Sequence, residues 1–238
     1  MCSETNIQFT QSPTPWGFFA TGGLCACIAL VVIATLIALF GYHEIVKITT
    51  SAAAENPVNF TVAYLVASPI AIVLCVVFSK LRNGFSFAKY VGFVLPKTKQ
   101  LLIWTGITAT LLIFCDLTED GSRTDAKLTS AGLIPLFVFS FMAIFLAPLT
   151  EEMVFRGFAF KGLWHSVGSI WAILLTSFIF SLCHMNRSIV AQCMIFIFGI
   201  LLGTARVKTG SLYVPIIMHA TANFVGLCFI WNDALSVH

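Results

Sequence analysis

Several polar side chains interrupt the apolar C-terminal half of this chain at spacings that could support chemistry. They are a Glu-Glu-x-x-x-Arg run at Glu151, Glu152 and Arg156, a histidine at His184, and a His-x-x-x-Asn pair at His219 and Asn223. Ionisable groups at membrane depth are energetically costly, so each of them is a candidate functional residue. Together they predict a catalytic site buried within a bilayer.

The two adjacent carboxylates, Glu151 and Glu152, are expected to have different roles. Successive residues of a helix point about 100° apart, from 3.6 residues per turn. Glu152 lies four residues before Arg156, which is the favourable orientation for a helical ion pair, whereas Glu151 lies five residues before it. We therefore predict a structural Glu152–Arg156 pair, with Glu151 free for proton transfer. The alternative is that these are interfacial charges at a helix end, with side chains reaching toward headgroups.

The histidines and the asparagine fall on defined helix faces. His184 follows Phe180 by four residues, and Asn223 follows His219 by four, so each pair shares one face. Histidine transfers protons near neutral pH, and an asparagine amide can donate a hydrogen bond to a developing oxyanion. The alternative is ordinary hydrogen bonding between membrane helices.

A zinc site is also permitted by these residue types. Glu151, His184 and His219 could supply three ligands and leave a fourth position for water. There is no His-Glu-x-x-His motif, and the sequence neighbours of the histidines are largely apolar, with only Thr221 and Asn223 offering polar support for the ligands. We therefore favour chemistry that requires no cofactor, with zinc as the alternative.

Composition sets the class of protein. Of the 238 residues, 58% are hydrophobic and 10% are charged, whereas globular chains average about 25% charged residues. The sequence predicts an all-α, polytopic transmembrane helical bundle, with membrane lipid and a polypeptide substrate as partners. The net charge of +3 is too small and dispersed to indicate nucleic-acid binding.

About 20 apolar residues are needed to cross the hydrocarbon core. On that basis we predict one transmembrane domain over 1–238, with N-terminal helices of low specificity over 1–130 and a catalytic core over 131–232. Seven spans are expected, at Trp16–Phe40, Val58–Ser79, Leu101–Leu117, Ala131–Thr150, Ile170–Met185, Ser188–Ala205 and Leu212–Trp231. Phe85–Leu95 is expected to be an interfacial helix, with an eighth span as the alternative.

The distribution of basic residues predicts the orientation. The connection between the second and third spans carries Lys80, Arg82, Lys89, Lys97 and Lys99, which the positive-inside rule places in the cytoplasm. The N-terminus is then cytoplasmic, as are a 156–169 connection holding Arg156 and Lys161 and a turn holding Arg206 and Lys208. An acidic 116–125 loop lies on the other side. Glu151 is expected near the cytoplasmic end of its span.

The three motifs, in this order, resemble the CPBP family of CAAX-processing and bacteriocin-processing (Abi) intramembrane proteases. The family pattern is E-E-x-x-x-R, then F-x-x-x-H, then H-x-x-x-N or D, and this chain matches it from Glu151 to Asn223 without departure. The resemblance covers about 134–229. The residues before 130 match only in being apolar helices.

The resemblance implies a bundle with a conical catalytic cavity. By matching position, Glu151 and His184 would activate water, His219 and Asn223 would stabilise the oxyanion, and Glu152 and Arg156 would support them. The family carries a metalloendopeptidase label, whereas its Ras-converting-enzyme branch implies a glutamate and histidine mechanism without metal.

The function expected is therefore that of an intramembrane endopeptidase acting on a membrane-associated polypeptide. A prenylated CAAX-type C-terminus fits this geometry and the family. The alternatives are a bacteriocin-immunity protein or a non-catalytic scaffold on the same fold. A transporter with a Glu/His proton relay is disfavoured by the small size and the lack of two similar halves.

Overall fold

The computed structural model describes residues 14–43, 45–46, 57–82, 84–116, 132–184 and 188–236, and every regular element within them is helical. The elements are α1 (Phe18–Phe40), α3 (Pro57–Leu81), α4 (Phe87–Val91), α5 (Thr98–Asp116), α7 (Leu133–Phe141), η1 (Met142–Leu146), α8 (Ala147–Glu152), η2 (Met153–Ala159), α9 (Phe160–Leu182), α10 (Ile189–Thr209) and α11 (Tyr213–Ser236). The predicted all-α bundle is confirmed. The acidic 116–125 loop and the N-terminus lie almost wholly outside the described residues.

Within the part of the chain that the structure describes, five segments are long and apolar enough to cross a membrane. They are Phe18–Phe40, Val58–Leu81, Leu133–Leu182, Ile189–Thr209 and Tyr213–Asn232. The chain is thus a polytopic membrane protein, as its composition predicted. The count differs from the seven predicted spans for two reasons: the 101–117 span, present as α5, is not among the five, and two predicted spans lie inside the 50-residue Leu133–Leu182 segment.

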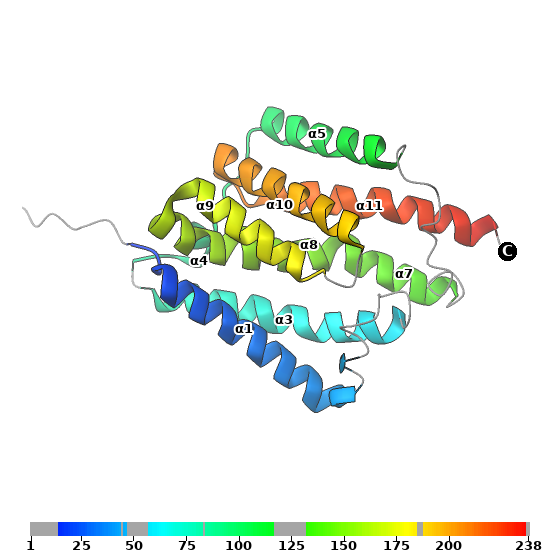
Figure 1. Ribbon diagram of the computed structural model, residues 1–238, viewed down its shortest axis with the longest axis horizontal. Coiled ribbons are helices and arrows are strands. Elements are labelled where there is room, and N and C mark those ends of the chain that lie inside the picture. Colours follow the sequence, from blue (N-terminus) through cyan, green and yellow to red (C-terminus); the bar gives the residue numbers. More distant parts are fainter. Residues whose placement is uncertain are drawn as a thin grey trace, which may run out of the picture.

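Gly168 divides that long segment into a helical hairpin. Its backbone has φ 84° and ψ 169°, a conformation that glycine adopts without a Cβ clash. Phe155 lies 13 residues before Gly168 and Phe180 lies 12 residues after it, and their rings pack edge to face at 5.3 Å. This pairing requires the chain to reverse, and Figure 1 shows α9 returning alongside the helix that precedes it.

The hairpin corrects the predicted 156–169 connection. Those residues are helical as far as the turn, and Arg156 is fully buried rather than exposed in a loop. Glu151 consequently lies about midway along the helix between Leu133 and Gly168. Its depth in the membrane stays a prediction.

Two π-helical turns flank the carboxylate pair. η1 immediately precedes α8, and η2 immediately follows it, so Glu151 and Glu152 lie between two stretches with widened turns. Single π turns inside α-helices often mark functional sites, because they change the facing of the following side chains and disturb the i→i−4 hydrogen-bond ladder.

The helix running from α7 through η2 is the centre of the bundle. α3 and α11 pack along it, and α9 and α10 contact it at η2. Figure 1 shows α5 at the edge of the bundle, alongside α11, and α1 at the opposite edge, against α3. The central position explains how residues from α3, α9 and α11 can all reach the Glu151–Glu152 region.

α4 is a short, protein-packed helix. Ser86 caps its N-terminus by accepting a hydrogen bond from the Lys89 amide at its hydroxyl oxygen, and Tyr90 and Val91 are fully buried. Burial raises the pKa of the Tyr90 phenol to about 12, so the side chain stays neutral. Five residues cannot cross a bilayer, so the alternative of an eighth span here is wrong.

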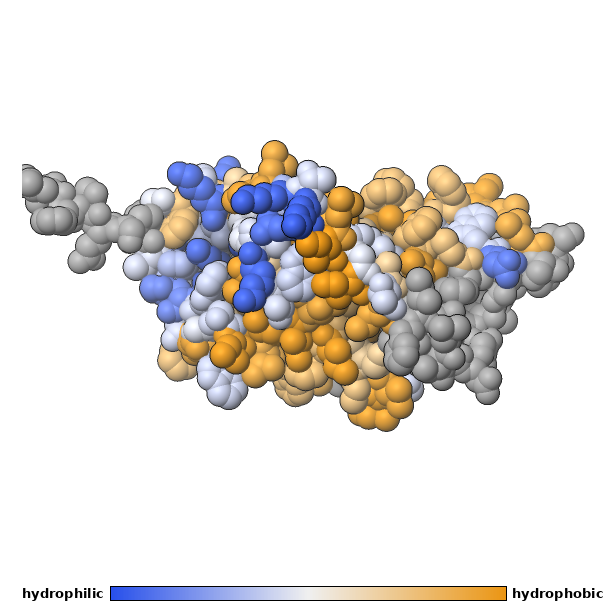
Figure 2. Space-filling view, turned by 90° about the horizontal axis from the view of Figure 1, so that it is seen from above, coloured by the Kyte–Doolittle hydropathy of each residue, from blue (hydrophilic) through white to orange (hydrophobic). Residues whose placement is uncertain are grey.

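The connections predicted to share one side of the membrane lie at one end of the molecule. Leu212 donates its amide to the Gly92 carbonyl at 2.8 Å, which joins the α10–α11 turn to the segment after α4. Figure 2 shows hydrophilic residues gathered toward the end at which α4 lies, with hydrophobic residues across the middle. Arg206, however, was expected in an exposed turn and is buried. The cytoplasmic assignment of this end stays a prediction.

Candidate functional site

Glu152 is buried and binds both the Arg156 guanidinium and the His219 imidazole. Its Oε1 accepts from Arg156 Nη1 at 2.9 Å, and both side chains are 0% exposed, so the predicted ion pair is present. The same oxygen accepts from His219 Nδ1 at 3.0 Å, a contact that the sequence did not predict. Because a carboxylate can only accept, His219 must carry its proton at Nδ1 for this bond.

Arg156 is fixed by more than its carboxylate partner. Its Nη2 donates to the Gly199 carbonyl on α10 at 3.2 Å, and its guanidinium carbon lies 4.5 Å from the centroid of the Phe180 ring. A planar guanidinium stacked on an aromatic ring and held by two acceptors has little freedom. Arg156 therefore ties α8, α9 and α10 together beneath the carboxylates.

His219 faces the interior of the bundle and turns its second nitrogen toward Glu151. The Nε2 atom lies 3.9 Å from Glu151 Oε2, beyond direct hydrogen-bond range. The ring packs edge to face against Phe180 at 5.8 Å and Phe198 at 5.9 Å. The histidine is thus held on three sides, with Nε2 as its available atom.

Glu151 has one oxygen bound and one oxygen free. Its Oε1 accepts from the Tyr64 hydroxyl of α3 at 2.7 Å. Its Oε2 is buried and has no hydrogen-bond partner among the residues that the structure describes. A buried carboxylate oxygen without a donor is costly, and such an atom calls for an explanation such as a bound water or a catalytic role.

His184 lies at the C-terminal end of α9, half-buried. Its Nδ1 donates to the Phe180 carbonyl at 2.8 Å, which leaves Nε2 as the nitrogen able to accept a proton. Its ring packs on the Phe180 ring at 4.9 Å, and no hydrogen bond or ion pair joins it to Glu151 among the described residues. The histidine nearest to Glu151 is therefore His219, whereas the resemblance had paired Glu151 with His184.

Asn223 contacts the central helix at the first π turn. Its Nδ2 donates to the Ala143 carbonyl in η1 at 2.7 Å. The amide has two N–H groups, so a second donor is left after this bond. Glu151 and Glu152 thus lie on α8, Arg156 follows in η2, and the other candidate residues come from the segments of α9 and α11, although not all of them touch one another.

The residues fit a three-ligand zinc site poorly in this arrangement. Among the described residues, no three His, Cys, Asp or Glu side chains converge on a point where a metal ion could bind. One premise of the sequence argument is nevertheless wrong: both histidines have a firm partner at Nδ1, Glu152 for His219 and the Phe180 carbonyl for His184. The arrangement fits zinc poorly because the candidate ligands do not converge on one point. Both histidines do have the hydrogen-bond partner that a zinc-binding histidine needs.

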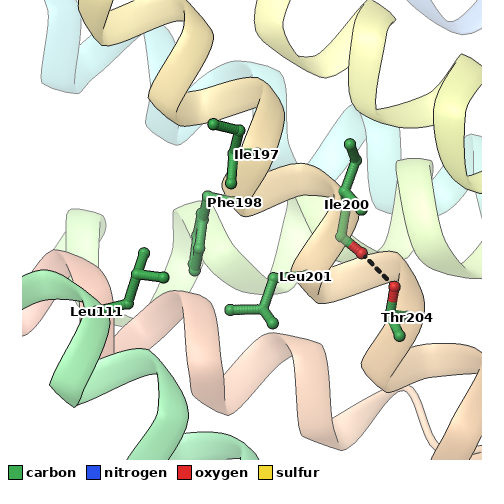
Figure 3. A pocket seen from close by; sticks show the side chains of 6 residues that line it. All are labelled: Leu111, Ile197, Phe198, Ile200, Leu201 and Thr204. Atoms are coloured by element: carbon green, nitrogen blue, oxygen red, sulfur yellow. Dashed lines mark hydrogen bonds between the residues drawn. The ribbon is translucent and has the colours of Figure 1, made fainter.

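An apolar pocket is lined in part by Phe198, the ring that also packs on His219. It has a volume of about 200 Å³ and lies between α5 and α10, with a lining of Leu111, Ile197, Phe198, Ile200, Leu201 and Thr204. Figure 3 shows the one polar member, Thr204, with its hydroxyl bonded to the Ile200 carbonyl. Since Phe198 both lines this pocket and packs on His219, a hydrocarbon group bound in the pocket would contact the same ring that contacts His219.

Sequence reasoning missed Tyr64 and Arg206. Tyr64 is an isolated phenol in an apolar helix, and no spacing rule connects it to a glutamate 87 positions away. Arg206 donates from Nε to the Arg156 carbonyl at 3.2 Å and from Nη2 to the Val91 carbonyl at 3.0 Å. Its signal was present, because it is a basic residue directly following the apolar run of α10, but it was assigned to an exposed turn.

Comparisons with known proteins agree with the resemblance. Residues 133–225 match the family model described as type II CAAX prenyl endopeptidase Rce1-like, a range that contains all three motifs. An uncharacterized 24.3 kDa protein of Escherichia coli is 32% identical over 111 residues, which cover 43% of this chain and 49% of that relative. The chain thus spans about half the length of the curated relative it matches. No solved structure matches.

Proposed function

We propose that this protein is an intramembrane endopeptidase that uses Glu151 as its general base. The observation that carries the proposal is the unpartnered Oε2 of Glu151, buried in mid-helix and facing His219 Nε2 across 3.9 Å. A carboxylate oxygen and an imidazole nitrogen separated by slightly more than a hydrogen bond are well placed to share one water molecule. The Rce1-like match supports a peptide bond as the bond attacked.

The proposed reaction requires only groups of this chain and water. Glu151 Oε2 takes a proton from water as the water oxygen bonds to the carbonyl carbon of the scissile peptide. The oxyanion that forms accepts hydrogen bonds from the second N–H of Asn223 and from the Nε2–H of His219, which in this proposal enters the reaction already protonated at both nitrogens, with Glu152 as its counter-ion, and keeps both protons throughout. The proton on Glu151 then passes to the leaving nitrogen as the C–N bond breaks, which restores the carboxylate.

His184 has an assisting role in this proposal. Its Nδ1 is engaged by the Phe180 carbonyl, so its Nε2 is the nitrogen that can approach water or the leaving group. It lies beside Phe180, which separates it from His219.

We propose a substrate that carries a hydrocarbon group near the scissile bond, of which a prenylated CAAX-type C-terminus is the example favoured by the family. The apolar pocket against Phe198 supports this choice, because its lining is almost wholly aliphatic and aromatic. A lipid-linked peptide could place its hydrocarbon there while its backbone lies against Glu151 and His219.

The experiment compares two peptides of one sequence, one farnesylated at its CAAX cysteine and one not. Purified protein in liposomes is incubated with each, and release of the C-terminal tripeptide is followed by mass spectrometry. We expect cleavage of the farnesylated peptide and none with Glu151→Gln. Absence of cleavage by wild-type protein, with the fold intact, would favour the scaffold alternative instead.

A further inference from the structure

Tyr64 connects the N-terminal half of the chain to the candidate base. It projects from α3, outside the 133–225 segment that matches the family model, and its hydroxyl donates to Glu151 Oε1 at 2.7 Å. The ring is half-buried and lies against Phe60, with centroids 6.1 Å apart. The phenol is thus the direct hydrogen-bond partner that the structure gives to Glu151.

The Tyr64 hydrogen bond gives the two carboxylate oxygens of Glu151 different surroundings. With Oε1 bound by Tyr64, the carboxylate plane cannot rotate freely, and Oε2 is held facing His219 Nε2 without touching it. Hydrogen bonds to an ionised acceptor are short and about twice as strong as neutral ones, and a distance of 2.7 Å agrees with that class. Without this bond, Glu151 could turn and pair directly with His219, which would close the gap between them.

We propose that Tyr64 is a positioning residue for Glu151, which holds the carboxylate so that Oε2 stays open toward His219 and the reacting water. The inference rests on the proposed function, since it assigns the geometry of that same site. It differs from a packing role, in which the hydroxyl would only add an interhelical hydrogen bond of about 1 kcal/mol to stability.

The primary test is Tyr64→Phe, which removes the hydroxyl and keeps the ring against Phe60. Because misplacement of a catalytic group by about 1 Å can cost roughly 10²-fold in rate, we expect kcat to fall by about 10- to 100-fold with KM little changed. The matched control is Tyr90→Phe, which removes a buried phenol hydroxyl that accepts from the Trp16 amide at 3.4 Å, away from the site. That variant should lower the melting temperature and leave kcat unchanged.

A double-mutant cycle separates positioning from general weakening. Glu151→Asp keeps a carboxylate but shortens it, so Asp at this position no longer reaches Tyr64. Tyr64→Phe should then cost at least five-fold less in kcat on the Glu151→Asp background than on the wild-type one. Equal losses on both backgrounds, or a wild-type kcat for Tyr64→Phe, would overturn the inference.

A readout without turnover keeps the two proposals apart. 3-Fluorotyrosine incorporated at position 64 should show a ¹⁹F resonance that moves in Glu151→Gln, while the same label at Tyr90 should not respond. If the wild-type protein cleaves no peptide, both the proposed function and this inference are wrong. If the wild-type protein is active but the ¹⁹F resonance at position 64 does not move in Glu151→Gln, only this inference is wrong.

Discussion

Glu152 and His219, 67 positions apart in sequence, share a buried hydrogen bond of 3.0 Å between Oε1 and Nδ1. The same oxygen holds Arg156, so one carboxylate orients both a cation and the imidazole that faces Glu151. Two neighbouring glutamates therefore divide into a support and a candidate base, because their side chains leave α8 in different directions and meet different partners.

Glu151→Gln and Glu152→Gln should fail in different ways. Glu151→Gln keeps the shape of the side chain and removes the proton acceptor, so proteolysis should be abolished in a protein of near wild-type melting temperature. Glu152→Gln leaves the fully buried Arg156 without a counter-charge, and breaking one partner of a buried pair costs about 3–5 kcal/mol. Expression yield and thermal unfolding should both suffer together with activity. Identical behaviour of the two variants in the stability and activity assays would refute this division.

The contrast between these residues also explains what the sequence could predict. The Glu152–Arg156 pair follows from helical spacing within one element, so local geometry was sufficient to predict it. The contacts of Glu152 with His219 and of Glu151 with Tyr64 depend on which helices are neighbours, and a single sequence does not specify that. The inward placement of His219 could be anticipated, because a polar group in an apolar span must find polar partners.

The extent of the helix that carries the site was predicted less well. Arg156 and Lys161 suggested the end of a span, because charged residues usually lie in loops. The helix instead continues to Gly168, since Glu152, Phe180 and the Gly199 carbonyl compensate the buried guanidinium. The two π turns next to α8 had no sequence signal at all, and they set the facing of the residues around Glu151.

Asn223→Ala tests the oxyanion role. If the second amide N–H reaches the developing oxyanion, its removal should lower kcat by roughly 10²–10³-fold with KM little changed. The side chain also donates to the Ala143 carbonyl, so thermal unfolding of the variant must be measured alongside. An increase in KM with kcat intact would assign Asn223 to substrate binding instead.

Arg206 should matter to the site through the backbone of Arg156. Arg206→Met removes the donors to the Arg156 and Val91 carbonyls while it retains most of the apolar stem. Each of the two carbonyls then loses a charged donor, and a buried acceptor left unsatisfied costs about 1–3 kcal/mol. We expect a clear fall in melting temperature and a partial loss of activity, whereas Lys208→Met, on an exposed residue two positions along, should change neither.

Gly92→Ala offers an independent test of the same contact. Gly92 has φ 84°, and a Cβ at this position would overlap the Arg206 guanidinium, so alanine is disfavoured by both backbone strain and sterics. The variant should be destabilised more than Arg206→Met. The double variant, in which the guanidinium is absent, should recover part of the loss in thermal unfolding. Strictly additive losses would mean that the two residues do not interact.

Metal dependence is the last prediction, and it follows from the arrangement of the donors. Zinc requires ligands within about 2.0–2.3 Å of one point, with both histidines neutral. Glu151 and His219 face each other, but His184 lies against Phe180 and makes no ion pair with Glu151, and no three such donors converge among the described residues. We therefore expect purified protein to cleave its substrate after exhaustive treatment with a strong zinc chelator, with elemental analysis showing far less than one zinc per chain. The control is wild-type protein carried through the same steps with chelator already saturated with zinc, which reports any loss caused by the treatment itself and not by metal removal. Activity that disappears with the metal and returns with added zinc would overturn the prediction and assign Glu151, His184 and His219 as the ligands, with a rearrangement of His184 on binding.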